Sequence, residues 1–73
     1  MEKDEDRSQR FKRLASLRTN SVLLRLKVLG NCANRQAYEY TEEDVKRIFS
    51  TIEEQLKVVK SRFHFHKDKQ FKL

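Results

Sequence analysis

The spacing of apolar residues between positions 41 and 63 most constrains the fold of this chain. Apart from Val58, which lies off the stripe, apolar side chains recur there at intervals of three or four residues, with one adjacent pair. These residues are Val45, Ile48, Phe49, Ile52, Leu56, Val59 and Phe63. At about 100° per residue they fall on one stripe, which predicts an amphipathic α-helix. Proline is absent and glycine occurs once, so the composition favours long helices.

The residues before this stripe carry the signals of a helix N-terminus. Thr41 is the expected N-cap, and Asp44 stands three residues later, where a capping box places an acidic side chain. Tyr40 and Val45 occupy the two positions of a hydrophobic staple. The second helix is therefore predicted to begin at about residue 41.

Residues 7–29 also predict a helix, with a broader apolar face than the second. One seam repeats about every seven residues and consists of Leu14, Leu17, Ser21, Leu24 and Val28. An adjacent seam consists of Phe11, Ala15, Val22, Leu26 and Leu29. Together the seams cover roughly half of the helix circumference. Gly30 follows and is expected to end this helix as its C-terminal cap.

The fold class expected from these patterns is all-α, as a two-helix antiparallel αα-hairpin forming a single small domain. Its parts are a helix at about 7–29, a connector at 30–40, a helix at about 41–65 and a basic tail at 66–73. The second helix can cover only one seam of the first, and a contiguous exposed apolar surface usually marks an interface. We therefore expect a homodimer, in which two hairpins form a four-helix bundle.

The predicted interface lies on the first helix and consists of Leu14, Leu17, Ser21, Leu24 and Val28, with Arg18 and Arg25. The two arginines fall between the apolar seams. In one interpretation their stems lie along the seam and their charged ends reach water. In the other they are buried and paired with Asp44 or Glu53 of the same or a neighbouring chain. The first interpretation is preferred.

The connector between the helices has two interpretations. Glycine, asparagine and capping residues account for most of its composition, and a short helical turn is expected around residues 33–37. Loops often carry function, so a contact surface made by Asn34, Arg35, Tyr38 and Tyr40 is the alternative. The structural interpretation is preferred.

The charges are segregated along the chain, whose formal net charge is +6. Every charged residue between positions 7 and 27 is basic, and bases dominate again from position 57 onward. An antiparallel hairpin would bring both groups to one end, where they could bind the phosphates of DNA or RNA. The predicted nucleic-acid-binding residues are Arg7, Arg10, Lys12, Arg13, Lys57, Lys60, Arg62 and Lys67. Phe63, Phe65 and Phe71 would add stacking surfaces for single strands.

No combination of residues predicts catalysis, a cofactor or a metal. His64 and His66 point in different directions on a helix and have no further Cys or His partner, so they are expected to be solvated. Cys32 has no nearby general base and is expected to be a buried or half-buried thiol. A lone thiol and the absence of any long apolar run favour a cytoplasmic protein.

Two functions from different classes remain as hypotheses. The first is a small non-enzymatic regulatory protein that self-associates and binds DNA or RNA through its basic end. The alternative is a protein-interaction module (an adaptor, inhibitor or small subunit) that docks an apolar seam on another protein. Contact of the basic tail with an anionic membrane is a weaker third hypothesis.

Overall fold

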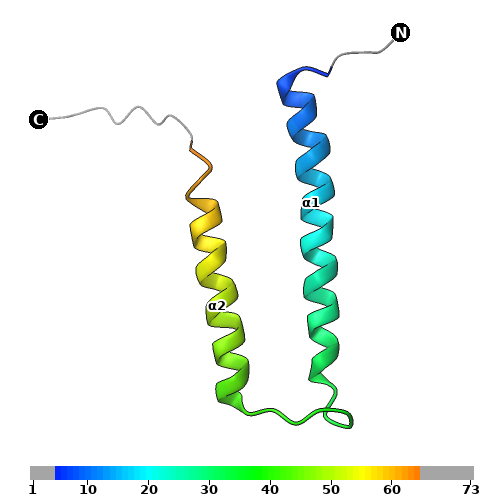
Figure 1. Cartoon of the computed structure of the whole chain (residues 1–73), viewed down its shortest axis with the longest axis vertical. Helices are drawn as coiled ribbons and strands as arrows, with labels where there is room; N and C mark the ends of the chain where they lie inside the picture. The colour runs from blue at the N-terminus through cyan, green and yellow to red at the C-terminus, as the bar shows by residue number, and fades with distance from the viewer. Residues whose placement is uncertain (1–4, 65–73) are drawn as a thin grey trace, which may run out of the picture. The chain divides into compact units, whose positions relative to one another are not determined.

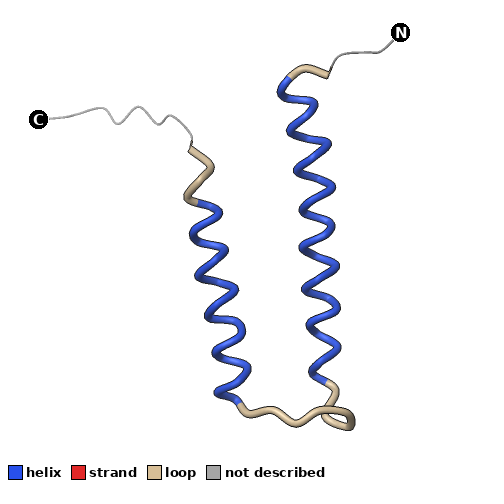
Figure 2. Tube along the Cα trace, in the orientation of Figure 1, coloured by secondary structure: helices blue, strands red, loops and turns tan. Residues whose placement is uncertain are grey.

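The computed structural model describes residues 5–64 of the 73-residue chain (Figure 1). This part contains helix α1 (Arg7–Gly30), a short 3₁₀ helix η1 (Asn31–Ala33) and helix α2 (Glu42–Lys60), with no strand among the described residues (Figure 2). The predicted all-α class is therefore confirmed. The predicted tail at 66–73 lies outside the described residues.

Helix α1 begins with a cap that the sequence analysis did not identify. Asp6 is the N-cap in an extended conformation, and its Oδ1 accepts a hydrogen bond of 2.7 Å from the Gln9 backbone N–H. The negative charge of Asp6 also offsets the unfavourable position of Arg7 and Arg10 near the positive end of the helix dipole. An aspartate followed three residues later by glutamine resembles a capping box, so the signal was present in the sequence.

The prediction that Gly30 caps α1 is wrong. Gly30 is the last residue of the helix, with φ −60° and ψ −24°, and the C-cap is Asn31, also in the right-handed helical region. The Asn31 N–H donates to the carbonyl oxygens of Val28 and Leu29, and the chain tightens into η1. Glycine permits a left-handed cap without requiring one, and here the backbone continues its right-handed turn.

The connector after η1 is organised by Asn34. Its Oδ1 accepts a hydrogen bond of 3.0 Å from the Gln36 N–H, which forms an Asx turn. Its carbonyl oxygen accepts hydrogen bonds from the N–H groups of Ala37 (3.2 Å) and Tyr38 (2.9 Å). The turn expected around residues 33–37 is therefore present, and it supports the structural interpretation of the connector.

Helix α2 begins with the predicted capping box. The Asp44 N–H donates to the Thr41 hydroxyl, and the Thr41 N–H donates to the Asp44 carboxylate, each at 3.0 Å. The helix ends at Lys60, earlier than the predicted residue 65. Ser61 is the C-cap, and its hydroxyl donates to the Val58 carbonyl oxygen at 2.6 Å. This local hydrogen bond from the side chain to the backbone competes with the backbone hydrogen bonds that would extend the helix.

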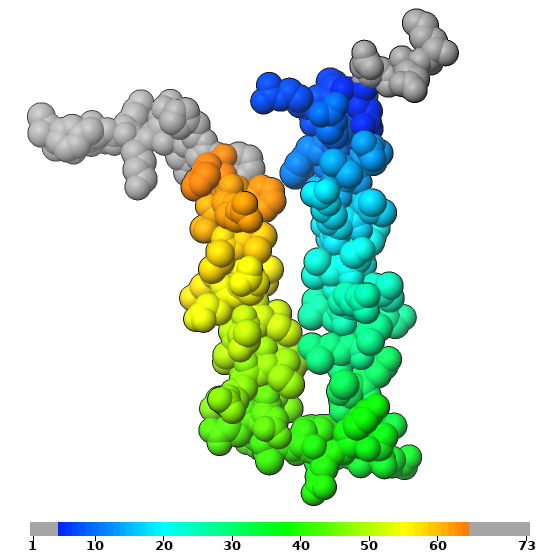
Figure 3. All heavy atoms as spheres, in the orientation of Figure 1, coloured from blue at the N-terminus to red at the C-terminus, as the bar shows by residue number. Residues whose placement is uncertain are grey.

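The chain divides into two units, Met1–Glu39 and Tyr40–Leu73, and the structure determines each unit by itself. Within each unit the described residues form no hydrophobic core, since none from 5 to 64 is buried. Side chains stand out along the length of each helix (Figure 3). The antiparallel hairpin and the four-helix bundle therefore stay predictions. An apolar stripe without a core needs a partner surface, because burial of apolar area is the main stabilising contribution to folding.

Candidate nucleic-acid interface

The first two turns of α1 present a concentrated basic surface. Arg7, Arg10 and Arg13 recur every third residue, and Lys12 lies on another side of the helix. All four side chains are exposed, and α1 contains no acidic residue to neutralise them. Exposed guanidinium and ammonium groups in this density suit phosphate contacts, which need charge more than sequence-specific geometry.

One of these basic residues, Arg13, forms an ion pair with the carboxylate of Glu5. The Arg13 Nε donates to Glu5 Oε2 at 2.8 Å, and Arg13 Nη2 donates to Glu5 Oε1 at 2.9 Å. The hydrogen bonding from Arg13, joined by the charges of Arg13 and Arg10, lowers the pKa of the Glu5 carboxyl. The same hydrogen bond raises the pKa of Arg13. Sequence reasoning missed Glu5, because its partner lies beyond the three- and four-residue spacings of helical pairs.

The second predicted group lies at the end of α2. Lys57 and Lys60 occupy its last turn, where positive charge is favoured by the helix dipole. Arg62 follows the helix, and its backbone N–H donates to the Val59 carbonyl oxygen at 3.0 Å. Lys67 lies outside the described residues. The two basic groups belong to different units, so their meeting at one end stays a prediction.

The predicted interface on α1 is open to solvent. The side chains of Leu17 and Leu24 are 63% and 60% exposed, and Val28 is 48% exposed. Ser21 is exposed as well, and Leu14 is half-buried. Leucine side chains this exposed gain little hydrophobic free energy when their own unit folds. Their burial against a partner surface would therefore stabilise the protein.

Arg18 and Arg25, which lie between the apolar seams, are exposed in α1. Among residues 5–64 neither forms an ion pair. None of the described residues is buried, so the preferred interpretation, in which the charged ends reach water, stays a prediction. Pairing across an interface stays a prediction.

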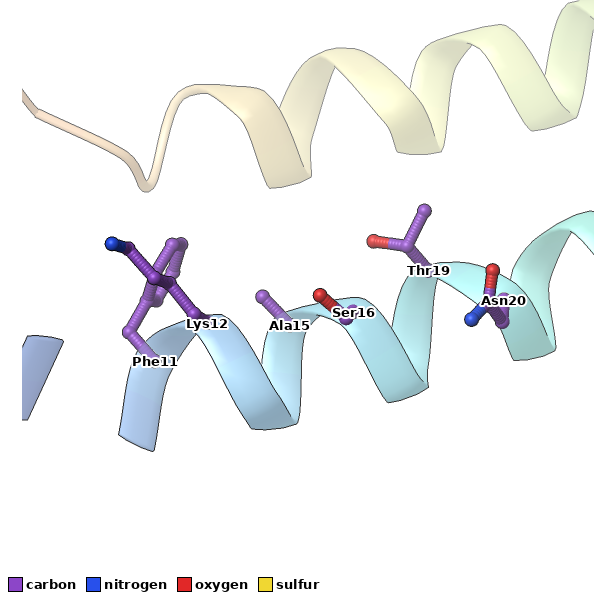
Figure 4. A pocket seen from close by; sticks show the side chains of 6 residues that line it. All are labelled: Phe11, Lys12, Ala15, Ser16, Thr19 and Asn20. Carbon is purple, nitrogen blue, oxygen red and sulfur yellow. The ribbon is translucent and has the colours of Figure 1, made fainter. Parts of the chain in front are cut away.

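A shallow open groove runs along one side of α1, lined by Phe11, Lys12, Ala15, Ser16, Thr19 and Asn20 (Figure 4). It lies between two rows of side chains that are spaced four residues apart, the usual furrow of a helix surface. Its lining combines an aromatic ring, small polar groups and one ammonium group. It is open to solvent along its length, unlike the concave clefts that enclose a small molecule.

The thiol of Cys32 is exposed in η1, so the expected buried or half-buried position is wrong. The 3₁₀ turn presents this side chain to solvent rather than toward an apolar face. Within the described part of the chain, no group of three His, Cys, Asp or Glu side chains could hold a metal ion. Neither described helix combines the length and apolar character that a membrane crossing requires.

Comparison with protein-family models, with curated proteins and with solved structures finds no match to this chain. The charges and the apolar faces of the two helices are therefore the features that bear on function.

Proposed function

We propose that this chain is a small non-enzymatic regulatory protein that self-associates through apolar helix faces and binds DNA or RNA through its basic residues. One observation carries the nucleic-acid part: α1 contains only bases among its charged residues, and four of them are exposed in its first two turns. Clustered Lys and Arg on one helix form the electrostatic footprint of phosphate binding.

The exposed seam of α1 supports self-association. Both described units lack a core of their own, and the chain has no internal disulfide to replace one. A second copy supplies an identical apolar face, and two-fold pairing buries the same patch on both chains. Self-association would also double the number of basic helices in one assembly, which raises the affinity for a long polyanion.

The test compares two variants that each lose two positive charges. Arg10→Gln with Lys12→Gln removes bases from the proposed interface, whereas Lys46→Gln with Arg47→Gln removes them from the first half of α2, beside its acidic first turn. Binding to a labelled random duplex and a labelled single strand is measured across a salt series. Glutamine is a good helix former, so both variants should keep the far-UV helical signal.

The interface variant is expected to bind about tenfold or more weakly, with a salt slope reduced by about two, because each phosphate contact contributes about 0.9 to that slope. The α2 variant should keep nearly the wild-type slope. If the two variants lose affinity equally, the first turns of α1 are not the binding surface. If the wild type fails to bind either probe at low salt, the nucleic-acid proposal is wrong.

A protein-interaction module is the second candidate, and the exposure of Leu17 and Leu24 favours it. In that case the seam of α1 docks on another protein and nucleic acid is irrelevant. Leu24→Glu should then abolish partner capture, while Leu23→Glu, on the polar side of the helix, should retain it. Equal capture by both variants would exclude the seam as the docking surface.

A further inference from the structure

The contact between Glu5 and Arg13 spans eight positions of the chain and joins a residue outside α1 to its second turn. Side chains on a helix lean toward its N-terminus, so the long Arg13 side chain extends toward the helix start. Glu5 precedes the N-cap Asp6, and both of its carboxylate oxygens accept hydrogen bonds from the Arg13 side chain. The pair lies at the surface, with side chains 57% (Arg13) and 33% (Glu5) exposed.

The geometry of this pair is that of anion recognition. Two donors of one guanidinium, Nε and Nη2, each contact a different oxygen of the same anion. This planar fork fits carboxylates and phosphates alike, since both offer two oxygens at a similar separation. The positive charge of Arg10 also acts on the Glu5 carboxylate, which lowers its pKa further. Arg13 therefore holds the anion with two hydrogen bonds, and the charge of Arg10 adds to the attraction.

We propose that the Arg13 fork, with Arg10 beside it, is a phosphodiester-binding site that Glu5 occupies as an internal competitor when no nucleic acid is bound. This inference rests on the proposed function, because nucleic acid supplies the phosphodiester. Binding exchanges one singly charged anion for another: the backbone phosphate takes the two N–H donors, and the Glu5 carboxylate is released to solvent. Glu5 thus lowers the affinity of the interface for nucleic acid.

The strength of the competition follows from the exposure of the pair. Exposed ion pairs are weak, so Glu5 lowers the affinity for nucleic acid without blocking it. Removing its charge by Glu5→Gln should tighten binding about two- to fivefold at low salt. Glu54→Gln is the matched control, because it makes the same change in net charge at an exposed position in the middle of α2.

Binding of the full-length wild type, Glu5→Gln and Glu54→Gln to a labelled duplex is measured by fluorescence anisotropy at fixed low salt. The gain from Glu5→Gln should exceed that from Glu54→Gln, and it should disappear when Arg13→Gln is also present. Glu5 lies outside α1, and glutamine at position 13 suits a helix, so the helical signal should be retained in every variant.

A second measurement follows the exchange directly. The Glu5 carboxyl is titrated by ¹³C NMR in the unbound protein and in the duplex complex. Loss of the Arg13 hydrogen bonds on binding should raise the Glu5 pKa toward or above its ordinary value.

The outcomes separate this inference from the proposed function. If the wild type binds but Glu5→Gln binds no tighter than Glu54→Gln, or if the Glu5 pKa is the same in the complex, the competitor role is overturned and nucleic-acid binding stands. If no variant binds the duplex at low salt, both are overturned.

Discussion

Substitution of Gly30 by alanine is expected to stabilise α1, although glycines at helix ends are often left-handed, a conformation that alanine avoids. Gly30 adopts φ −60° and ψ −24°, which an L-residue adopts without strain. Outside its two chain neighbours and the backbone of its own helix, a Cβ added at this position would meet no atom within 4 Å. Alanine therefore fits the native backbone and has fewer conformations to lose from the unfolded chain.

The magnitude follows from the helix propensities. Alanine in place of glycine inside a helix is worth roughly 0.5–1 kcal/mol, and the last residue of α1 should fall in the lower part of that range. For a domain of this size that unfolds cooperatively, a gain of about 0.5 kcal/mol corresponds to a rise in melting temperature of roughly 2–4 °C. A left-handed Gly30 would reverse the sign, because an L-residue there costs roughly 1–2 kcal/mol.

The assay is thermal and urea unfolding followed by far-UV circular dichroism, at one fixed protein concentration because self-association changes apparent stability. Gly30→Asn serves as the control, since asparagine tolerates the left-handed region and is a weaker helix former than alanine. The right-handed backbone predicts the stability order alanine, asparagine, glycine. An alanine variant less stable than both the asparagine variant and the wild type would refute the reasoning.

Two further predictions concern the ends of the helices. Thr41→Ala removes the hydroxyl that accepts the Asp44 N–H and should destabilise α2 by about 1 kcal/mol, whereas Thr41→Ser should remain near the wild type in urea unfolding. The Glu5–Arg13 pair should stabilise the start of α1 above the ordinary glutamate pKa of 4.5 and lose that contribution as the pH falls through the lowered pKa of the folded state. The helical signals of wild type and Glu5→Gln should therefore converge at low pH, and a difference that is constant from pH 7 to pH 2 would contradict this.

The helices themselves were predictable because their signals are local. The three- and four-residue spacing of apolar side chains identified both elements, and the pairing of Thr41 with Asp44 correctly located the start of α2. The turn around Asn34 was expected for the same reason, since an asparagine side chain bonds the backbone two residues ahead.

The helix ends were harder to predict. Gly30 and Asn31 each accept more than one backbone conformation, so their order in the chain does not decide where α1 stops. At the other helix, Phe63 continues the apolar spacing, but α2 ends at Lys60 and Ser61 bonds back to the Val58 carbonyl. The spacing of apolar residues predicts which face of a helix is apolar, but it does not predict which backbone hydrogen bonds form.

The candidate site, like the helices, could be predicted from the sequence only in part. The basic residues of α1 could be chosen from the sequence, because charge is a property of composition and spacing. The occupation of Arg13 by Glu5 could not, since their contact depends on where the chain leaves the helix at Asp6 and on the direction in which the arginine leans.

The sequence by itself therefore determined that this chain is helical, where each helix begins within a residue or two, and which faces are apolar or basic. These features follow from propensities and from periods of three to four residues, which act over a single turn of helix. Only the three-dimensional structure decided that Gly30 is right-handed, that Cys32 is exposed and that Glu5 holds Arg13. Those features depend on backbone dihedral angles and on the directions of side chains in space. Several backbones are compatible with the same spacing of apolar and charged residues, and they differ in these angles and directions.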